Sequence, residues 1–418
     1  MTDRTVLHCD CNSFFASVEC MLDPSLASVP MAVCGSEEDR HGIVLAKNEK
    51  AKAYGIKTAE TVWSAKKKCK DLVIVPPHHN EYLRVSRMVN EIYRRYTDLV
   101  EPFGIDECWL DVTASRRLFG DGLEIAERIR NEVKNEIGIT VSIGVSFNKI
   151  FAKLGSDYKK PDAITLISKD NYKQIVYPLP VDSLLFVGER TADELKKAGI
   201  KTIGELASVE PSFLAYKFGK MGAMLSTYAR GEDESPVASV YDKNDPKSIG
   251  NGMTFKKDIS SDDEIRLGIA FLSEEICERM RRKGKKCSTV CVTIKDTMLC
   301  NITRQRQLAY PTNISSEISE VAFSIVKKEW KTGKPIRMLT VTATSLTDEK
   351  NASFQTDFFD DCEQRRKRSE SLERTIDKIR GKHGRAIISR AGIMSNDIGI
   401  SISENERTDA ENSDKKKK

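Results

Sequence analysis

The chain of 418 residues has no apolar run of the about 18 residues that a membrane-spanning helix needs. The N-terminal residues pass directly into a strand-like segment and show no apolar signal-peptide core. No two of the eleven cysteines are spaced as C-x-x-C, and only five histidines are present. We therefore expect a cytoplasmic protein without a membrane anchor or a disulfide framework, whose reduced cysteines serve as small core residues.

Size and composition indicate a soluble protein with more than one core. The length favours roughly two to four domains, and 39% hydrophobic with 31% charged residues is typical of globular chains. The net charge of +5 implies little by itself. However, residues 243–347 carry more Lys and Arg than Asp and Glu, which suits a module that follows a phosphate backbone. A solvated basic surface would explain the same excess.

The first 170 residues mix strand-like and helix-like segments, which predicts an α+β domain with a largely antiparallel sheet and helices on one side. In one long helix the apolar positions Leu83, Met88, Ile92 and Tyr96 recur near a period of 3.6, and Asn80 is the expected N-cap. The predicted strands cover residues 5–9, 42–47, 72–77 and 139–146, and the predicted helices cover 13–22, 48–55, 61–70, 80–98, 123–136 and 148–160.

The composition and hydrophobic pattern of the remaining chain change three times. Residues 171–231 read as helical, 233–245 as a polar linker, and 248–346 as alternating strands and helices. Beyond residue 347 the chain is polar and we expect one helix over 369–382 and a disordered end in "DKKKK".

The stretch "EPFGIDECWLDV", Glu101–Val112, places two adjacent acids at a glycine turn between two strand-like runs. Gly104 predicts a hairpin. On its second strand Cys108 and Leu110 share one face and Glu107 shares the other with Trp109 and Asp111, because side chains alternate. Asp106 lies at the bend.

A third acid, Asp10, ends the strand-like segment "TVLHCD" just before a helix. If that strand pairs with the hairpin, Asp10, Asp106 and Glu107 converge. Clustered carboxylates repel one another unless cations neutralise them, and oxygen-only ligands with open positions suit Mg²⁺. The alternative is that these are unrelated surface acids at a turn.

Two further features are consistent with a phosphate-bearing ligand. The stretch "DCNSFFASVE" leads into a helix N-terminus, whose free N–H groups favour phosphate. Lys149, Lys153 and Lys160 come from one helical region, and the first two share a face. A solvated helix face would explain these lysines equally well. The adjacent pair His78 and His79 reads as loop rather than as a metal site.

Together, "HCDCNSFFASVE", "GIDECWLDV" and "VSIGVSFNKIFAKLGSDYKKPD" resemble a Y-family translesion DNA polymerase of the bacterial polymerase IV type, with some similarity to the polymerase V catalytic subunit. The resemblance covers roughly residues 4–348. It implies a multidomain α+β right hand with a ferredoxin-like palm, small fingers, a helical thumb and an α/β little-finger domain. The implied boundaries are palm 1–10 and 78–167, fingers 11–77, thumb 168–234, linker 235–246, little finger 247–348 and tail 349–418.

The resemblance also implies roles for residues around the acids. Asp10, Asp106 and Glu107 match the catalytic metal ligands for a pair of Mg²⁺ ions, and Cys11 matches a position that contributes its backbone carbonyl. Phe15 matches the steric gate that excludes a ribose 2′-hydroxyl.

Further matches concern the triphosphate and the DNA. Phe14, Phe15, Lys52 and Lys160 match positions that bind the incoming triphosphate. Glu49 departs from the pattern, because many relatives have Tyr at this position. The resemblance therefore leaves open how the γ-phosphate is bound.

The segment "VGERTADELKKAGI" resembles a helix-hairpin-helix, which would offer the backbone of Gly188 to a DNA phosphate, whereas the alternative is a plain helical turn. We expect Lys149 and Lys153 to contact DNA as well. The segment "QTDFF" resembles a sliding-clamp-binding peptide through Gln355, Phe358 and Phe359. The implied partners are primer-template DNA, deoxynucleoside triphosphates and a sliding clamp, with a monomeric chain and no membrane.

Two other functions compete with this interpretation. A nucleotide cyclase also carries paired carboxylates on a hairpin, but it has no need of a helix-hairpin-helix or a basic distal domain. A DNA-binding scaffold with a decayed palm would have no need of an intact trio of acids. Incorporation of deoxynucleotides on a primed template separates both from a polymerase.

Overall fold

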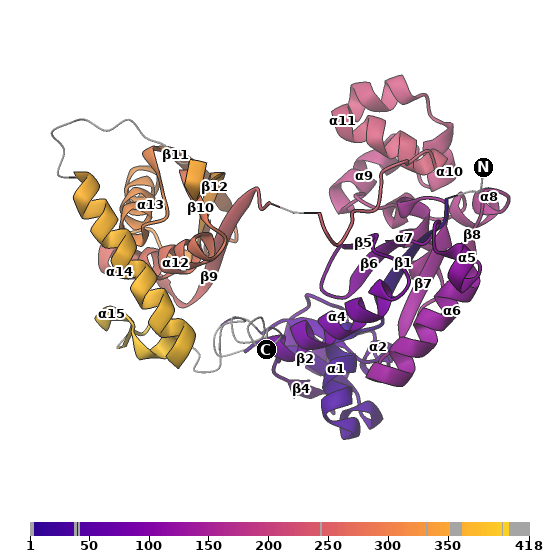
Figure 1. Cartoon of the computed structure of the whole chain (residues 1–418), viewed down its shortest axis with the longest axis horizontal. Coiled ribbons are helices and arrows are strands. Elements are labelled where there is room, and N and C mark those ends of the chain that lie inside the picture. Colours follow the sequence, from indigo (N-terminus) through magenta and orange to yellow (C-terminus); the bar gives the residue numbers. More distant parts are fainter. Residues whose placement is uncertain are drawn as a thin grey trace. The chain divides into compact units, whose positions relative to one another are not determined.

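The computed structural model describes residues 4–36, 40, 42–242, 245–331, 333–351, 362–394 and 396–400. The chain forms two compact units (Figure 1). The first unit consists of Met1–Gly35 and Gly42–Lys243, and the second of Ser36–His41 and Asn244–Lys418. The division falls within the segment 235–246, where the composition indicates a linker.

A five-stranded sheet organises the first unit, in the order β5-β6-β1-β7-β8. The central strand β1 pairs antiparallel with both of its neighbours, and only β7 and β8 run parallel, so the expected largely antiparallel sheet is confirmed. The strands are β1 (Val6–Cys11), β5 (Val100–Pro102), β6 (Glu107–Asp111), β7 (Val141–Ser146) and β8 (Ile164–Ile167).

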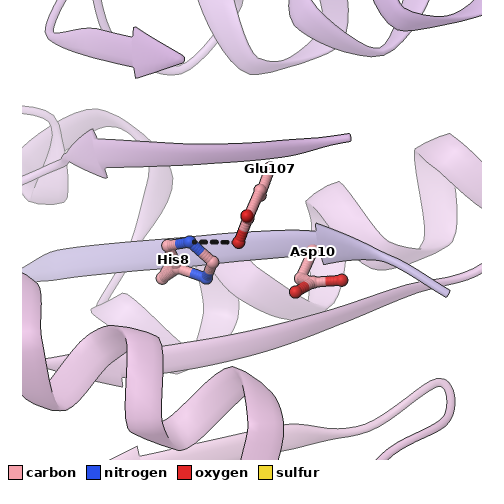
Figure 2. A group of neighbouring side chains, drawn as sticks. All are labelled: His8, Asp10 and Glu107. Carbon is pink, nitrogen blue, oxygen red and sulfur yellow. Dashed lines mark ion pairs between the residues drawn. The ribbon is translucent and has the colours of Figure 1, made fainter. Parts of the chain in front are cut away.

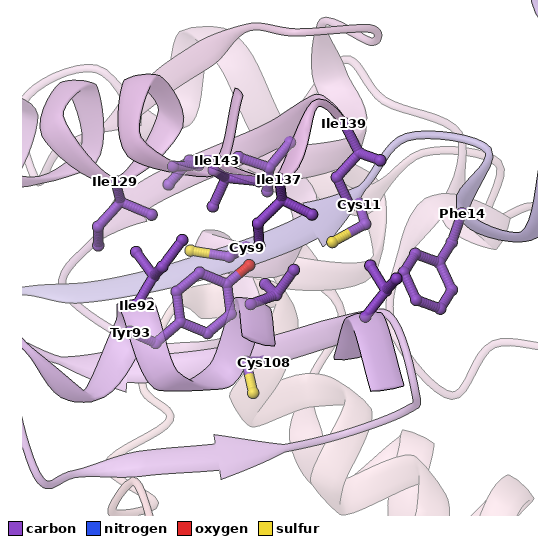
Figure 3. Packing of buried hydrophobic residues seen from close by; sticks show 14 of the residues in the cluster. Cys9, Cys11, Phe14, Ile92, Tyr93, Cys108, Ile129, Ile137, Ile139 and Ile143 are labelled. Atoms are coloured by element: carbon purple, nitrogen blue, oxygen red, sulfur yellow. The ribbon is translucent and has the colours of Figure 1, made fainter. Parts of the chain in front are cut away.

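One face of this sheet is covered by a large apolar core. Leu7, Cys9 and Cys11 project from alternate positions of β1 into it. Figure 3 shows Cys9, Cys11 and Cys108 packed among isoleucines and Tyr93. Burial raises the pKa of the Cys108 thiol to about 12, so it stays protonated. The helices that contribute to this core are α1 (Phe14–Leu22), α4 (His79–Arg94) and α6 (Gly122–Glu132).

The expectation that helices lie on one side of the sheet is wrong, because α7 (Lys149–Tyr158) packs on the other face. Two glycines make this approach possible. A Cβ atom on Gly144 of β7 would lie 1.9 Å from the carbonyl oxygen of Ala152, and one on Gly155 would lie 2.9 Å from the Gly144 Cα. Asn148 caps α7 by accepting a hydrogen bond from the Phe151 amide.

A smaller three-stranded sheet, β3-β2-β4, lies between α1 and α4 in the chain. The sequence predicts β3 (Val44–Lys47) and β4 (Val73–Val75) but misses the short, fully buried β2 (Met31–Cys34). Four consecutive buried residues show no alternation, so no period marks them as a strand. The predicted helices here are confirmed as α2 (Glu49–Ala53) and α3 (Val62–Lys68).

The long helix α4 differs from its prediction at its start and in its buried face. It begins at His79, with His78 rather than Asn80 at the N-cap, so the loop prediction holds for His78 and is wrong for His79. Leu83 is 41% exposed, whereas Tyr82 is fully buried. The apolar ring of Tyr82 packs in the core, so the buried face of α4 is shifted by about one residue from the predicted face.

The last part of the first unit is helical, as predicted. Gly188 is the N-cap of the second of these helices, and nothing lies within 4 Å of the place where its Cβ would be. The helices are α8 (Tyr172–Val176), α9 (Glu189–Lys197), α10 (Ile203–Ser208) and α11 (Pro211–Arg230).

The segment after α11 is polar, but part of it contacts the rest of the first unit. Val237 is buried, the Ala238 amide donates to the Glu101 carboxylate at 2.8 Å, and the Val240 amide donates to the Asp98 carbonyl at 2.9 Å. The start of the predicted linker is therefore held on the first unit.

The second unit contains a four-stranded antiparallel sheet in the order β11-β10-β12-β9, with α12 and α13 against one face. This matches the alternation expected over residues 248–346. The elements are β9 (Ser248–Ile259), α12 (Asp262–Arg282), β10 (Lys285–Asp296), β11 (Asn301–Thr312), α13 (Ser315–Glu329) and β12 (Ile336–Asp348).

The helix predicted over 369–382 is confirmed, the tail holds more structure than that one helix, and its end in "DKKKK" lies outside the described residues. Helix α14 runs over Cys362–His383 and is longer than expected, and α15 covers Ala391–Met394. Ile393, Ile398 and Ile400 are buried in the core of the second unit, and the Lys256 amide donates to the Ile398 carbonyl at 3.0 Å. Isolated isoleucines in a polar stretch carry no period, which is why the sequence pattern conceals this contact.

Ion pairs hold α14 and the following segment against α12. The side chain of Arg281 is 6% exposed and donates to Asp377 at 2.6 and 2.8 Å as well as to Glu373. Arg385 donates to Glu278 at 2.6 Å. Buried pairs of this kind are costly to break from one side, so the segment is an integral part of the second unit.

We expect Ile398→Ala to destabilise the second unit by about 2–5 kcal/mol, because it removes a fully buried side chain. Hydrogen exchange of β9 and α12 amides in the full chain, followed by mass spectrometry, should accelerate. Leu372→Ala, at a 60% exposed position of α14, is the matched control and should change little. Equal exchange in both variants would show that the segment does not belong to this core.

Two cysteines depart from the predicted role as core residues. Cys291 is half-buried on β10, and Cys300 is exposed beside the β10–β11 turn. Cys20 is half-buried but packs against the core of the first unit, and the remaining cysteines whose burial the structure describes are buried.

Candidate active site

Antiparallel pairing of β1 with β6 brings the three acids together. Asp10 is the direct partner of Glu107 in the register of these strands. The Cys11 amide donates to the backbone carbonyl of Asp106 at 3.0 Å, which fixes the bend beside the end of β1. Residues almost a hundred positions apart thus lie at one end of neighbouring strands.

Alternation along the strands directs these side chains to the face that carries α7. His8 and Asp10 lie on that face of β1, and Glu107 lies beside them on β6 (Figure 2). One ligand atom from each of the three residues lies within 4.8 Å of the others. Asp106 is not part of this compact group, and its Oδ1 would lie 3.2 Å from a Cβ placed on Gly104.

Two lysines from the α7 region offset the negative charge. Lys153 Nζ lies 3.1 Å from Asp10 Oδ2 and 2.5 Å from Glu107 Oε2. Lys160 Nζ lies 2.8 Å from Asp10 Oδ2 and 2.7 Å from Asp157 Oδ1. The expectation that Lys153 contacts DNA does not agree with this position, because its ammonium group is held among the acids.

The pKa values show how strongly the charges interact. Burial raises the pKa of Asp106, and the nearby carboxylates of Asp10 and Glu107 raise it further. Burial opposes ionisation of Glu107 too, but its contacts with His8 and Lys153 lower its pKa to about 2. Burial lowers the pKa of His8, which favours the neutral ring. The carboxylates repel one another and therefore favour a bound cation.

The donor set fits Mg²⁺. Three partly buried carboxylates offer only oxygen atoms and leave room for waters or phosphates, which this ion retains in its shell. The Cys11 thiol points into the apolar core on the other face of the sheet, so only the backbone of this residue is available at the site.

Phe14 and Phe15 occupy different environments. The Phe14 side chain is buried in the core, so only its backbone is available to a ligand. Phe15 is half-buried and stacks on Tyr82, with ring centroids 4.1 Å apart and an interplanar angle of 12°. The Tyr82 hydroxyl in turn donates to the buried carboxylate of Glu19. Sequence reasoning missed Tyr82 and Glu19, since nothing in their spacing links them to Phe15.

Residues Glu49 and Lys52 lie at the start of α2. Lys52 Nζ lies 3.5 Å from Glu49 Oε1, and Ser13 Oγ donates to the same carboxylate at 3.4 Å. Both side chains are about half exposed, so the Lys52 ammonium can leave this weak pair for an anion.

The Lys149 ammonium group is paired with an acid of the first unit. Its Nζ donates to both carboxylate oxygens of Glu101, at 2.7 and 2.8 Å, and its side chain is 11% exposed. Its carbonyl accepts a hydrogen bond from Trp109 Nε1 at 2.9 Å. The expected DNA contact of this lysine is therefore not supported by the fold.

The Gly188 backbone has open space around it at the start of α9. Gln355, Phe358 and Phe359 lie outside the described residues. Across the parts of the chain that the structure describes, no helix is both long and apolar enough to cross a membrane.

His8 is a further residue of this site that sequence reasoning overlooked, and it lies beside the acids. It lies two positions before Asp10, so the period of a strand places both on one face. That spacing is a signal the sequence does contain.

The chain matches two family models. The first, described as the impB/mucB/samB family, matches residues 9–157, and the second, its C-terminal domain, matches residues 246–358.

Relatives of known type match almost the whole chain. The DNA polymerase IV of Acetivibrio thermocellus is 46% identical over 397 residues, which is 95% of this chain and 99% of that protein. The DNA polymerase IV of Moorella thermoacetica is 37% identical over 391 residues, 93% of this chain and 96% of that protein.

A solved structure supports the fold. It is a Y-family DNA polymerase chimera of Dbh and Dpo4, with a TM-score of 0.72 and 22% identity, and the match covers 82% of this chain and 99% of that one. The chain belongs to the impB/mucB/samB family, the Y-family DNA polymerases of the bacterial polymerase IV type.

Proposed function

We propose that this chain is a Mg²⁺-dependent, template-directed DNA polymerase of the low-fidelity translesion type. Family membership makes it a DNA-directed DNA polymerase. The observation that carries the finer proposal is the convergence of Asp10, Asp106 and Glu107 at one end of β1 and β6, with Lys160 beside them. The full-length polymerase relatives argue against a cyclase or a scaffold.

Asp10, Asp106 and Glu107 would hold a pair of Mg²⁺ ions, with the carbonyl of Cys11 as a further ligand. When bound, these ions lower the pKa of the primer 3′-hydroxyl and neutralise charge on the triphosphate. In the net reaction the primer oxygen bonds to the α-phosphorus and pyrophosphate leaves. The carboxylates position both reactants, and most of the rate gain comes from positioning and charge neutralisation.

The residues around the acids would bind and select the nucleotide. Lys160 and Lys52 supply point charges for the triphosphate, and the amides of Phe14 and Phe15 at the start of α1 suit a phosphate. The Phe15 ring would exclude a ribose 2′-hydroxyl, and its stack on Tyr82 keeps it in place.

We assign the five-stranded sheet to the palm, residues 11–77 to the fingers, 168–234 to the thumb and 247–348 to the little finger. The fingers are small, so they would press weakly on the nascent base pair and tolerate damaged templates. Extension of a primer past a panel of template lesions tests this tolerance of damaged templates. A sliding clamp as partner, a monomeric state and a cytoplasmic location remain predictions of the sequence.

We expect Asp106→Ala to abolish primer extension and to leave primer-template binding largely intact. The Cys11 amide donates a hydrogen bond to the backbone carbonyl of Asp106 and not to its side chain, so the substitution should leave the fold intact. Extension of a labelled primer with deoxynucleotides and Mg²⁺ measures the activity. The exposed acid Asp170 provides the matched control, since Asp170→Ala should retain extension. Activity near wild type in Asp106→Ala would refute the assignment.

We expect Phe15→Ala to admit ribonucleotides, because it removes the ring that would meet a 2′-hydroxyl. The ratio of kcat/KM for deoxynucleotides to that for ribonucleotides should fall by at least about 10-fold, or 1.4 kcal/mol. Leu22→Ala, at an exposed position on the same helix, should keep the ratio of the parent chain. An unchanged ratio in Phe15→Ala would place sugar selection elsewhere.

We expect Lys149→Met to leave the salt dependence of DNA binding unchanged, because the Lys149 ammonium is already paired with Glu101. Loss of a phosphate contact would reduce the slope of log K against log salt by about 1. Fluorescence anisotropy over a salt series measures the slope. Stability should fall by about 3–5 kcal/mol, because Glu101 loses its partner, and Lys149→Met with Glu101→Gln should recover part of it.

A further inference from the structure

A buried carboxylate lies one helical turn after Phe15 on α1. It belongs to Glu19, whose side chain is only 3% exposed. Glu19 accepts a hydrogen bond from the Tyr82 hydroxyl, and His78 Nδ1 lies 2.9 and 3.0 Å from its two carboxylate oxygens. A carboxylate only accepts, so His78 donates through Nδ1–H whether its ring is neutral or charged. Glu19 therefore joins α1 to the beginning of α4.

The Tyr82 ring connects this carboxylate to Phe15. Tyr82 is fully buried, and its ring stacks on that of Phe15 with centroids 4.1 Å apart. The His79 ring meets both rings edge-on, with centroids 6.0 Å from Phe15 and 5.7 Å from Tyr82. Burial and the bond to Glu19 raise the pKa of the Tyr82 hydroxyl, so the hydroxyl keeps its proton and donates. One side chain thus contacts Phe15 with its ring face and Glu19 with its hydroxyl.

Stability alone does not explain a carboxylate at this position. Burial of the Glu19 side chain costs free energy that an apolar side chain would not cost. The bonds from Tyr82 and His78 offset that cost, but replacing a buried pair of this kind by apolar residues is often neutral for stability. The carboxylate supplies direction instead, because its hydrogen bond fixes where the Tyr82 hydroxyl lies and with it the plane of the ring.

We propose that Glu19 positions the Phe15 ring through Tyr82 and thereby acts on sugar selection. The carboxylate holds the Tyr82 hydroxyl, and the anchored Tyr82 ring supports one face of Phe15. Phe15 is only half-buried, so packing alone leaves its ring some freedom, which the stack on Tyr82 removes. The effect on sugar selection rests on the proposed function, since it requires Phe15 to exclude a ribose 2′-hydroxyl, whereas the positioning of the ring does not.

Nuclear magnetic resonance of the Phe15 ring tests the positioning without any enzyme activity. In the full chain with ¹³C-labelled phenylalanine, the Phe15 signal is the one that vanishes in Phe15→Leu, and the stacked Tyr82 ring should shift it upfield. Tyr82→Phe keeps a stacking ring and removes only the hydroxyl, so the upfield shift should shrink. Glu19→Leu should have the same effect. An unchanged Phe15 signal in Tyr82→Phe, which tests the bond even if Glu19→Leu fails to fold, would overturn the proposal.

Sugar selection is the second readout, measured as the ratio of kcat/KM for deoxynucleotides to that for ribonucleotides. The ratio should fall by about 3- to 10-fold in Tyr82→Phe and in Glu19→Leu, because the Phe15 ring is present but no longer held. Glu19→Gln keeps an acceptor oxygen for the Tyr82 hydroxyl and should restore the ratio. A structural role alone would lower both kcat/KM values together. A ratio that falls in Phe15→Ala but in neither of the other two variants would contradict the proposal.

Double variants show whether the carboxylate acts through Tyr82 and Phe15. Glu19→Leu should add nothing to the effect of Tyr82→Phe or of Phe15→Ala on the ratio, because residues that act through one series of contacts are not additive. Additive losses would show that Glu19 acts by another route. Glu81→Leu is the matched control, since Glu81 precedes Tyr82 on α4 and its carboxylate pairs with Arg84. Its ratio and its Phe15 signal should match those of the parent chain.

Phe15→Ala distinguishes failure of this proposal from failure of the proposed function. A ratio that stays unchanged in Phe15→Ala, together with an altered Phe15 signal in Glu19→Leu, would refute the sugar gate and leave the positioning of the ring by Glu19 standing. A parent chain that shows the upfield Phe15 signal but never extends a primer would refute the polymerase in the same way, without touching the positioning.

Discussion

The antiparallel pairing of β1 with β6 is the interaction on which the rest of the first unit depends. It makes Asp10 the partner of Glu107 and ties Cys11 to the backbone of Asp106. Three like charges in one place oppose folding. Lys153 and Lys160 offset that repulsion, and they can do so because Gly144 and Gly155 let α7, which carries Lys153 and ends two residues before Lys160, lie directly on the sheet. The charge that suits cation binding is thus balanced within the fold.

The two faces of β1 have different roles, because one packs in the apolar core and the other carries residues of the site. Leu7, Cys9 and Cys11 enter the apolar core, while His8 and Asp10 face α7. The core holds the strand rigidly, so the acids keep their relative positions without relying on loops. The same rigidity holds His8 Nε2 at 3.4 Å from Glu107 Oε2.

The second unit shows a different way of closing a core. Its sheet and two helices leave apolar surface that Ile393, Ile398 and Ile400 cover from a segment far along the chain. Arginines of α14 and the residues after it pair with acids of α12, while Arg281 of α12 pairs with acids of α14. Since such pairs cost more to break from one side than they contribute as a whole, they specify where the segment lies more than they stabilise it.

The sequence by itself determined most of the strands and helices around the site, the hairpin at Gly104 and the three acids, because these depend on local period, turn residues and ordered motifs. Tertiary structure alone decided that Lys149 pairs with Glu101, that Lys153 lies among the acids and that residues 396–400 join a core. The sequence around a lysine does not show whether its ammonium group contacts a phosphate or a carboxylate. Its partner is set by which strands and helices pack together, and that packing depends on contacts between residues far apart in the chain.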